Sequence, residues 1–422
     1  MKKSMLATSM LVALSCQATA ADSADLERRL AEQEERIQLL EANQSSRSRA
    51  STTDIKVSGY VNAAGGATNE GTSGKSTYQG LDGDPTFTSL SSAGLQIEAK
   101  VNDRVSGTLQ FFSAGSEDFD TKVEWAYITY RPSSSLSFRA GQLVLPLYMH
   151  SQYQTVGYAY TWITLPQEVY ATAPVRTLQG IDATWQFTTG SIAHSLNVAA
   201  GNQKLDQNIV VPVTYEVNKS ANLNLTSNIG DLSIWLGVST AEIDLPLPNL
   251  SIPPSSLFAG PLAIDLSPYS MVDDNGLFTS VGIQYDNGAL LFNAERVELD
   301  FETSWAATNI GQYAMLGYRF GRFLPSVTWA SVEDDGWDLG TALDPVAGLL
   351  YNTIATNQKS WTFGLRTDLE GGLALKAEVM SFYDLGNKTQ ASPFGSTNSL
   401  WSGTPDKGDD PMVFRVAAHL VF

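Results

Sequence analysis

The chain has 422 residues, of which 43% are hydrophobic and only 17% are charged, and its formal net charge at pH 7 is -18. The mean hydropathy is -0.10, and after the N-terminal segment no apolar run reaches the roughly 18 residues that a membrane-spanning helix needs. These values exclude a helical membrane protein, and the acidic balance disfavours nucleic acid as a partner.

The first 20 residues have the three parts of a secretory signal peptide. A basic start is followed by an apolar run over residues 5–14, too short to span a bilayer, and by small residues at 18–20 that suit a signal peptidase. A lipoprotein signal at Cys16 is the alternative, but Leu14 stands one place out of the usual order. Cleavage after residue 20 removes the only cysteine, which excludes thiol catalysis and disulfides in the mature chain.

Residues 21–44 predict a short coiled-coil segment, followed by a flexible linker over residues 45–53. The heptad positions a and d are occupied by Leu30, Ile37 and Gln44 and by Leu26, Gln33 and Leu40. Fewer than three heptads are marginal in water, so we expect this helix to form by association on an oligomer. The alternative is a charged amphipathic tether.

Residues 54–422 predict a membrane β-barrel of about 16 strands. The strands are expected at 54–64, 86–100, 105–115, 122–131, 136–146, 177–187, 191–203, 219–229, 231–241, 276–286, 289–300, 308–320, 323–333, 358–369, 373–385 and 412–422. Tight turns such as Asn287-Gly288 and Gly371-Gly372 alternate with long connections at 147–176, 242–275, 334–357 and 386–411. Short turns on one side and long loops on the other are typical of bacterial outer-membrane barrels. The fold class is therefore all-β and antiparallel, with the long loops facing outward.

Period-two alternation assigns side chains to the lipid or to the lumen. The last strand has Phe414, Val416 and Leu420 on one face and Arg415 and His419 on the other. The same parity places a mixed set of charges in the lumen: Lys56, Arg139, Arg319, Arg366, Lys376, Arg415, Glu98, Asp182, Asp368 and Glu378. The lumen thus contains a series of arginines despite the acidic total.

The whole chain after the signal resembles the trimeric outer-membrane porins of Gram-negative bacteria. The N-terminal coiled coil resembles the subgroup that takes up dicarboxylates. In such porins the third external loop folds inward, which here implies a constriction loop at 147–176. Its candidate pore residues are Tyr148, His150, Tyr153, Tyr158, Tyr160, Glu168 and Arg176, joined from the barrel wall by Arg139, Arg319, Arg366 and Arg415. The alternative is that the loop tyrosines only pack the loop against the wall.

Enzymatic and metal chemistry have little support in the sequence. The three histidines, His150, His194 and His419, lack metal-ligand spacing, and 16 strands are more than the outer-membrane hydrolases use. The acidic pair Asp334 and Asp335, in an external loop, could bind Ca²⁺ through carboxylate oxygens, although solvated loop acids are the more common case. We expect no enzymatic activity and no other cofactor.

The sequence therefore predicts a porin that admits small hydrophilic solutes, with a preference for anions such as carboxylates. A guanidinium pairs with a carboxylate through two hydrogen bonds, so a series of arginines offers several weak sites. The expected partners are outer-membrane lipid and lipopolysaccharide, two further copies in a homotrimer, and the solutes, with residues 21–44 in the periplasm. The alternative function is a structural anchor or adhesin that uses the coiled coil to bind a periplasmic or cell-wall partner.

Overall fold

The computed structural model describes residues 54–69, 76–173, 175–208, 212–247, 249–252, 262–302, 308–334, 357–385, 400–402 and 411–422. The predicted signal peptide, coiled coil and linker lie outside these residues. Within the described residues, no helix is long and apolar enough to cross a membrane.

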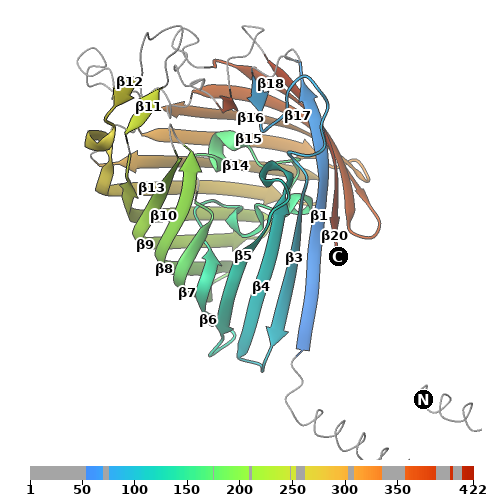
Figure 1. The fold of residues 1–422 in the computed structure, drawn as a ribbon. Coiled ribbons are helices and arrows are strands. Elements are labelled where there is room, and N and C mark those ends of the chain that lie inside the picture. Colours follow the sequence, from blue (N-terminus) through green and yellow to red (C-terminus); the bar gives the residue numbers. More distant parts are fainter. Residues whose placement is uncertain are drawn as a thin grey trace, which may run out of the picture. The chain divides into compact units, whose positions relative to one another are not determined.

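Sixteen antiparallel strands form a closed barrel, which confirms the predicted fold class. In chain order they are β1 (Asp54–Thr68), β3 (Ser92–Lys100), β4 (Val105–Ala114), β5 (Thr121–Tyr130), β6 (Leu136–Val144), β7 (Thr177–Thr189), β8 (Ile192–Asn208), β9 (Pro212–Ile229), β10 (Leu232–Leu245), β13 (Met271–Asp286), β14 (Leu290–Phe301), β15 (Asn309–Tyr318), β16 (Phe323–Asp334), β17 (Gln358–Leu369), β18 (Leu373–Tyr383) and β20 (Met412–Val421). Each strand pairs with its neighbours in sequence, and β20 closes the barrel against β1 (Figure 1). Closure pairs every edge, as a sheet in lipid requires.

Tight turns join alternate pairs of strands at one end of the barrel. Gly190, Gly230, Gly288, Gly321 and Gly371 have φ values between 59° and 87°, a range that glycine adopts without steric cost. The predicted turn positions are therefore confirmed. The long connections lie at the opposite end, and one of them, residues 145–176 between β6 and β7, carries the candidate site.

The two faces of the sheet differ as the parity predicted. On the outer face, Ile181 is 63% exposed, Phe363 59% and Val416 48%, whereas Arg415 and His419 on the inner face are 3% and 1% exposed. An apolar outer band and a polar inner face suit a barrel with lipid outside and water inside.

Several strands extend differently from the prediction. We expected residues 204–218 to form a connection, but β8 and β9 continue through most of it and are paired as far as Asn208 and Pro212. The Nζ atom of Lys204 lies 2.6 Å from Glu216 Oε1 across this extension, and such cross-strand pairs of opposite charge stabilise a ladder. In addition, β3 begins at Ser92 instead of residue 86, and β13 begins at Met271 instead of residue 276.

Two small sheets were not predicted. β11 (Leu250–Ile252) pairs with β12 (Leu262–Ile264), and β2 (Thr77–Tyr78) pairs with β19 (Trp401–Ser402). The second sheet joins the β1–β3 connection to the β18–β20 connection. Tyr78, Leu81 and Trp401 pack against Phe382 of β18, all four at most 2% exposed. These two connections therefore cover part of the inner wall at β18 and β20.

Candidate functional site

The connection 145–176 folds against the inner wall of the barrel. It contains three short helical segments, η2 (Ser151–Tyr153), η3 (Gly157–Ala159) and α2 (Gln167–Tyr170). Figure 1 shows this green segment among the strands. Residues of the barrel wall contact this connection in two ways. They pack against its apolar side chains, and they form hydrogen bonds with its backbone groups.

Apolar side chains of the connection pack against β14, β15 and β16. The ring of Trp162 meets Tyr313 edge to face at 5.2 Å between centroids, and its Nε1 donates a hydrogen bond to Thr328 Oγ1 at 2.8 Å. Val169 and Tyr170 are 0% and 5% exposed in the same cluster. Burial of each such side chain stabilises the fold by about 1.5–3 kcal/mol, so these apolar contacts hold the connection against one wall of the barrel.

Two basic side chains of the wall capture backbone carbonyls of the connection. Lys376 of β18 is 4% exposed, and its Nζ donates to the carbonyl oxygens of Gly157 at 2.6 Å and Tyr160 at 2.7 Å and also to that of Trp162. Arg366 of β17 donates to the Tyr160 carbonyl at 2.7 Å and to that of Tyr158 at 2.9 Å. Buried carbonyls without partners are costly, so these cations stabilise the inward fold.

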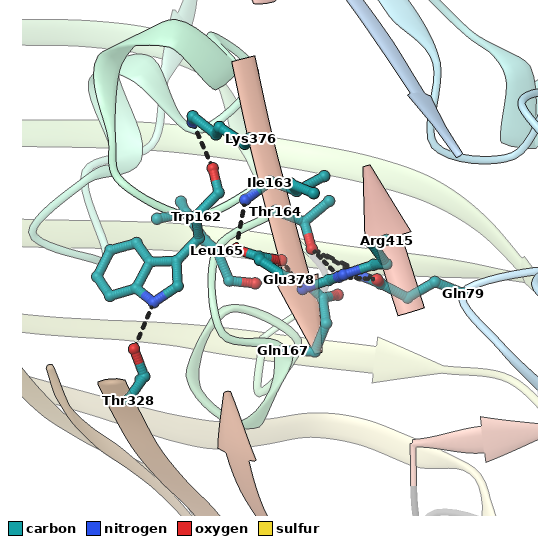
Figure 2. A network of polar contacts seen from close by, with 10 residues as sticks. All are labelled: Gln79, Trp162, Ile163, Thr164, Leu165, Gln167, Thr328, Lys376, Glu378 and Arg415. Atoms are coloured by element: carbon teal, nitrogen blue, oxygen red, sulfur yellow. Dashed lines mark hydrogen bonds and ion pairs between the residues drawn. The ribbon is translucent and has the colours of Figure 1, made fainter. Parts of the chain in front are cut away.

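A buried ion pair ties the connection to β18 and β20. Arg415 Nη2 donates to Glu378 Oε2 at 2.6 Å, while the backbone N–H of Ile163 donates to Glu378 Oε1 at 2.8 Å. Arg415 Nη1 also donates to Thr164 at 2.7 Å and to Gln79 Oε1 at 2.8 Å (Figure 2). One guanidinium therefore joins three segments that lie far apart in the sequence.

Two further buried carboxylates fix the connection. Glu295 of β14 accepts the backbone N–H of Met149 at 2.7 Å and the hydroxyl of Tyr170 at 2.6 Å. Glu168, on α2 itself, accepts the side chains of Gln358 at 2.8 Å and Ser360 at 2.6 Å. Glu168 thus points into the wall and not into open space.

His150 lies within this packing. Its Nδ1 is 2.6 Å from the Tyr153 hydroxyl, and its ring stacks on Tyr170 with an interplanar angle of 8°. Burial lowers the pKa of His150 to about 4, so the imidazole is neutral at neutral pH. Tyr148 and Tyr160 are also buried, at 2% and 9% exposed.

The lumen arginines, which the sequence predicted as a series of weak anion sites within a mixed set of charges, have partners in the protein. The Arg139 guanidinium binds both oxygens of Asp182, and Arg319 binds Asp286, with Nη2 to Oδ2 at 2.8 Å. Arg366 also donates to Asp368 Oδ1, from Nε at 2.9 Å and from Nη2 at 2.7 Å, and Arg415 binds Glu378 as described above. Each charge is therefore largely balanced where it stands, because parity places a residue on a face but does not show its neighbour on the next strand.

Open space lies along the wall opposite the attached connection. A cavity of about 400 Å³ is lined by strands β3 to β10 and by Tyr148, Met149 and Gln152. Its other lining residues are mostly neutral and polar, and include Gln96, Thr108, Thr129, Ser137, Thr184, Ser195, Asn197, Asn224 and Thr226. Glu98, Arg131 and Arg139 are its charged members. A second cavity of about 340 Å³ lies between the connection and β1, β3 and β4, where Arg176 is 3.5 Å from Glu124.

Some residues of the site were not identified from the sequence. Lys376 and Glu378 were assigned to the lumen by parity, but not to the constriction, because the path of the connection was unknown. Within the described part of the chain, Arg131 pairs with no carboxylate and donates one side-chain hydrogen bond, to Ser106 Oγ at 3.2 Å. Arg131 stands two residues after Thr129, at the end of the predicted strand 122–131, so parity within that strand would have placed it on the inner face.

The candidate calcium site remains a prediction. Asp334 ends β16, and Asp335 lies outside the described residues. Among the residues that the structure describes, no group of three or more histidine, cysteine or carboxylate side chains is arranged to hold a metal ion.

Gly311 permits the close contact between α2 and the wall. A Cβ at this position of β15 would lie 2.3 Å from the carbonyl oxygen of Glu168 and 3.1 Å from the Cα of Val169. We expect Gly311→Ala to displace α2 and to raise single-channel conductance. Gly107→Ala on β4 is the control, because nothing lies within 4 Å of its Cβ. Equal conductance in the two variants would contradict this placement of the connection.

No protein-family model matches the sequence, and no curated protein sequence matches it. Solved structures do resemble the barrel. OmpF of Salmonella typhi, solved with daunomycin, has a TM-score of 0.56 at 11% identity and covers 88% of this chain and 98% of its own. The outer-membrane channel DcaP of Acinetobacter baumannii has a TM-score of 0.55 at 14% identity, covering 88% and 97%. An anion-selective porin of Comamonas acidovorans has a TM-score of 0.53 at 12% identity, covering 88% and 100%. At these identities the likeness shows a shared fold.

Proposed function

We propose that the chain is a diffusion channel for small hydrophilic solutes in the outer membrane of a Gram-negative bacterium. One observation carries the proposal: the connection 145–176 is attached to one wall by buried contacts, and polar space remains along the opposite wall. A loop that fills part of a barrel and leaves a polar path narrows the channel without sealing it.

The two faces of the barrel and its fold support this location. The apolar outer face suits contact with outer-membrane lipid and lipopolysaccharide. Two of the similar folds belong to proteins described as an anion-selective porin and as an outer-membrane channel. We further propose a homotrimer with the N-terminal segment in the periplasm, as the resemblance implies.

We propose that selectivity is weak and that carboxylates are admitted along with other small solutes. Paired arginines attract an approaching anion less than free ones, because the adjacent carboxylate cancels most of the guanidinium's field. Salt screens the remaining field over a Debye length of about 8 Å. In the linings of the two polar cavities, Arg131 and the loosely paired Arg176 are basic side chains that can favour anions. We therefore propose that the preference for anions is modest.

Conductance of the purified full-length protein in planar lipid bilayers tests the proposal. We expect discrete open steps, grouped in threes for a trimer, and a reversal potential in a salt gradient that is close to zero and slightly toward anions. Absence of steps from correctly folded protein would contradict the channel. It would favour the alternative of an anchor or adhesin, whose predicted coiled coil lies outside the described residues.

The Arg139 pair provides a charge test within the lumen. Asp182 has a side chain only 1% exposed beside this guanidinium. We expect Arg139→Ala to shift the reversal potential toward cations, because it leaves a carboxylate unpaired, and Asp182→Ala to shift it toward anions. The double variant should return close to the wild type. A double variant that matches Arg139→Ala would show that the two charges do not act as a pair.

A further inference from the structure

An apolar cavity interrupts the polar interior at the end of the barrel that bears the long connections. It lies between the two ends of the connection 145–176 and strands β9, β10, β13 and β14. Its lining residues are Leu145, Leu147, Ala173, Val175, Tyr215, Val217, Ser220, Ser239, Ala241, Ile243, Gly276, Phe278, Leu299 and Phe301. None of these is charged, and hydroxyl groups come only from Tyr215 and the two serines.

This lining is unusual for its place. The inner wall of a water-filled barrel is normally polar, because it faces water. Here Val217, Ile243 and Phe278 are inward-facing and 4% exposed each, and aromatic rings of Phe301 and Tyr215 are packed against them. Apolar surface gathered in a concavity marks a place where another apolar group can be buried.

Gly276 leaves part of the wall without a side chain. A Cβ at this position would lie 3.5 Å from both Ile243 Cγ1 and Phe301 Cε1, which is ordinary van der Waals contact. The free space measures about 50 Å³. One water needs roughly 10–15 Å³ of such space, so the cavity has room for several waters. A hydrocarbon segment of a few carbon atoms fills a comparable space.

We propose that this cavity binds the short hydrocarbon part of an amphipathic solute before the solute reaches the constriction. The proposal rests on the channel function proposed above and adds a class of solute to it. Leu145 and Leu147 connect β6 to the constricting segment, so a solute held here lies beside the entrance to the narrow part. The polar end of such a solute would remain in the water-filled lumen.

The test is block of the potassium chloride current by straight-chain carboxylates from acetate to octanoate. Each buried methylene contributes about 0.8 kcal/mol, which is about fourfold in apparent affinity. We expect the apparent affinity to rise by about fourfold per methylene over a few methylenes and then to level off when the cavity is full. The carboxylate is constant through the series, so charge attraction alone gives no such slope.

Gly276→Val should fill the cavity and remove the dependence on chain length, while conductance and block by acetate stay unchanged. Gly107→Val, at a position with open space around its Cβ, is the matched control and should keep the dependence. Ala241→Asp, which places a charge in the same wall, is the second variant and serves if the valine variant fails to fold. It should also remove the dependence.

Calorimetric titration of hexanoate into protein held in an amphipathic polymer separates this proposal from the channel function. A wild-type protein that conducts but shows neither a chain-length dependence nor a heat of hexanoate binding would overturn the proposal. Hexanoate binding that persists unchanged in Gly276→Val would place the site elsewhere. A protein without current that still binds hexanoate at this cavity would contradict only the channel function.

Discussion

Replacing Lys376 by methionine is expected to release the constricting connection from the wall and to raise single-channel conductance. The ammonium group donates to three carbonyl oxygens of the connection, and methionine has a similar length without a donor. Removing one partner from a buried charged network costs about 3–5 kcal/mol. We therefore also expect a lower unfolding temperature, measured by heat-modifiable migration on gels.

Lys56→Met is the matched control for this change. Lys56 lies near the start of β1 and is exposed. By parity it faces the inside of the barrel, as Lys376 does. We expect the Lys56→Met variant to keep the unfolding temperature and the single-channel conductance of the wild type. If Lys376→Met leaves both conductance and unfolding temperature at the values of Lys56→Met, the buried lysine does not hold the connection.

Deleting Phe422 is expected to prevent the barrel from closing in lipid. The N–H of Phe422 donates to the Gly59 carbonyl at 3.0 Å, and the N–H of Gly59 donates to the Phe422 carbonyl at 2.9 Å. Deletion leaves both groups of Gly59 unpaired at the seam, and each unsatisfied group in hydrocarbon costs several kcal/mol. We expect a large loss of folded protein after refolding into lipid vesicles, measured by heat-modifiable migration.

Phe422→Ala separates the backbone from the ring in this experiment. The alanine variant keeps both backbone hydrogen bonds and loses only the side chain, which is 65% exposed. We expect it to fold to a yield between those of the wild type and the deletion. A deletion variant that folds as well as the wild type would contradict the assignment of β20 to the closing position.

The strands could be predicted because each carries its own signal. Alternation over about ten residues fixes both the strand and the face of each side chain, and turns such as Asn287-Gly288 fix where one strand ends and the next begins. The extension of β8 and β9 was missed because Lys204 and Asp206 look like loop residues until their partners across the pair are known. Their partners, Glu216 and Thr214, lie on the facing strand.

The pairing of charges in the lumen could not be predicted in the same way. Arg139 faces Asp182 across β6 and β7, and these strands are joined by more than 30 residues whose length does not fix a register. Arg415 faces Glu378 across β18 and β20, which are also joined by a long connection. The role of Lys376 depends on where the connection 145–176 lies, and that position comes from contacts with many strands of the barrel at once, from β13 around to β1.

Cysteine accessibility at defined positions tests most directly the claim that solutes pass beside the attached connection. The chain has one cysteine, Cys16, in the predicted signal peptide, so single substitutions are readily interpreted. Gln152 and Thr226 line the 400 Å³ cavity. Ala330 is 2% exposed and belongs to the cluster that packs the connection against the wall. The three variants are Gln152→Cys, Thr226→Cys and Ala330→Cys. We expect a charged methanethiosulfonate reagent to reduce the current through the first two variants and to leave the third unchanged. If the reagent reduced only the current through Ala330→Cys, solutes would pass between the connection and β16, which would contradict a path beside the connection.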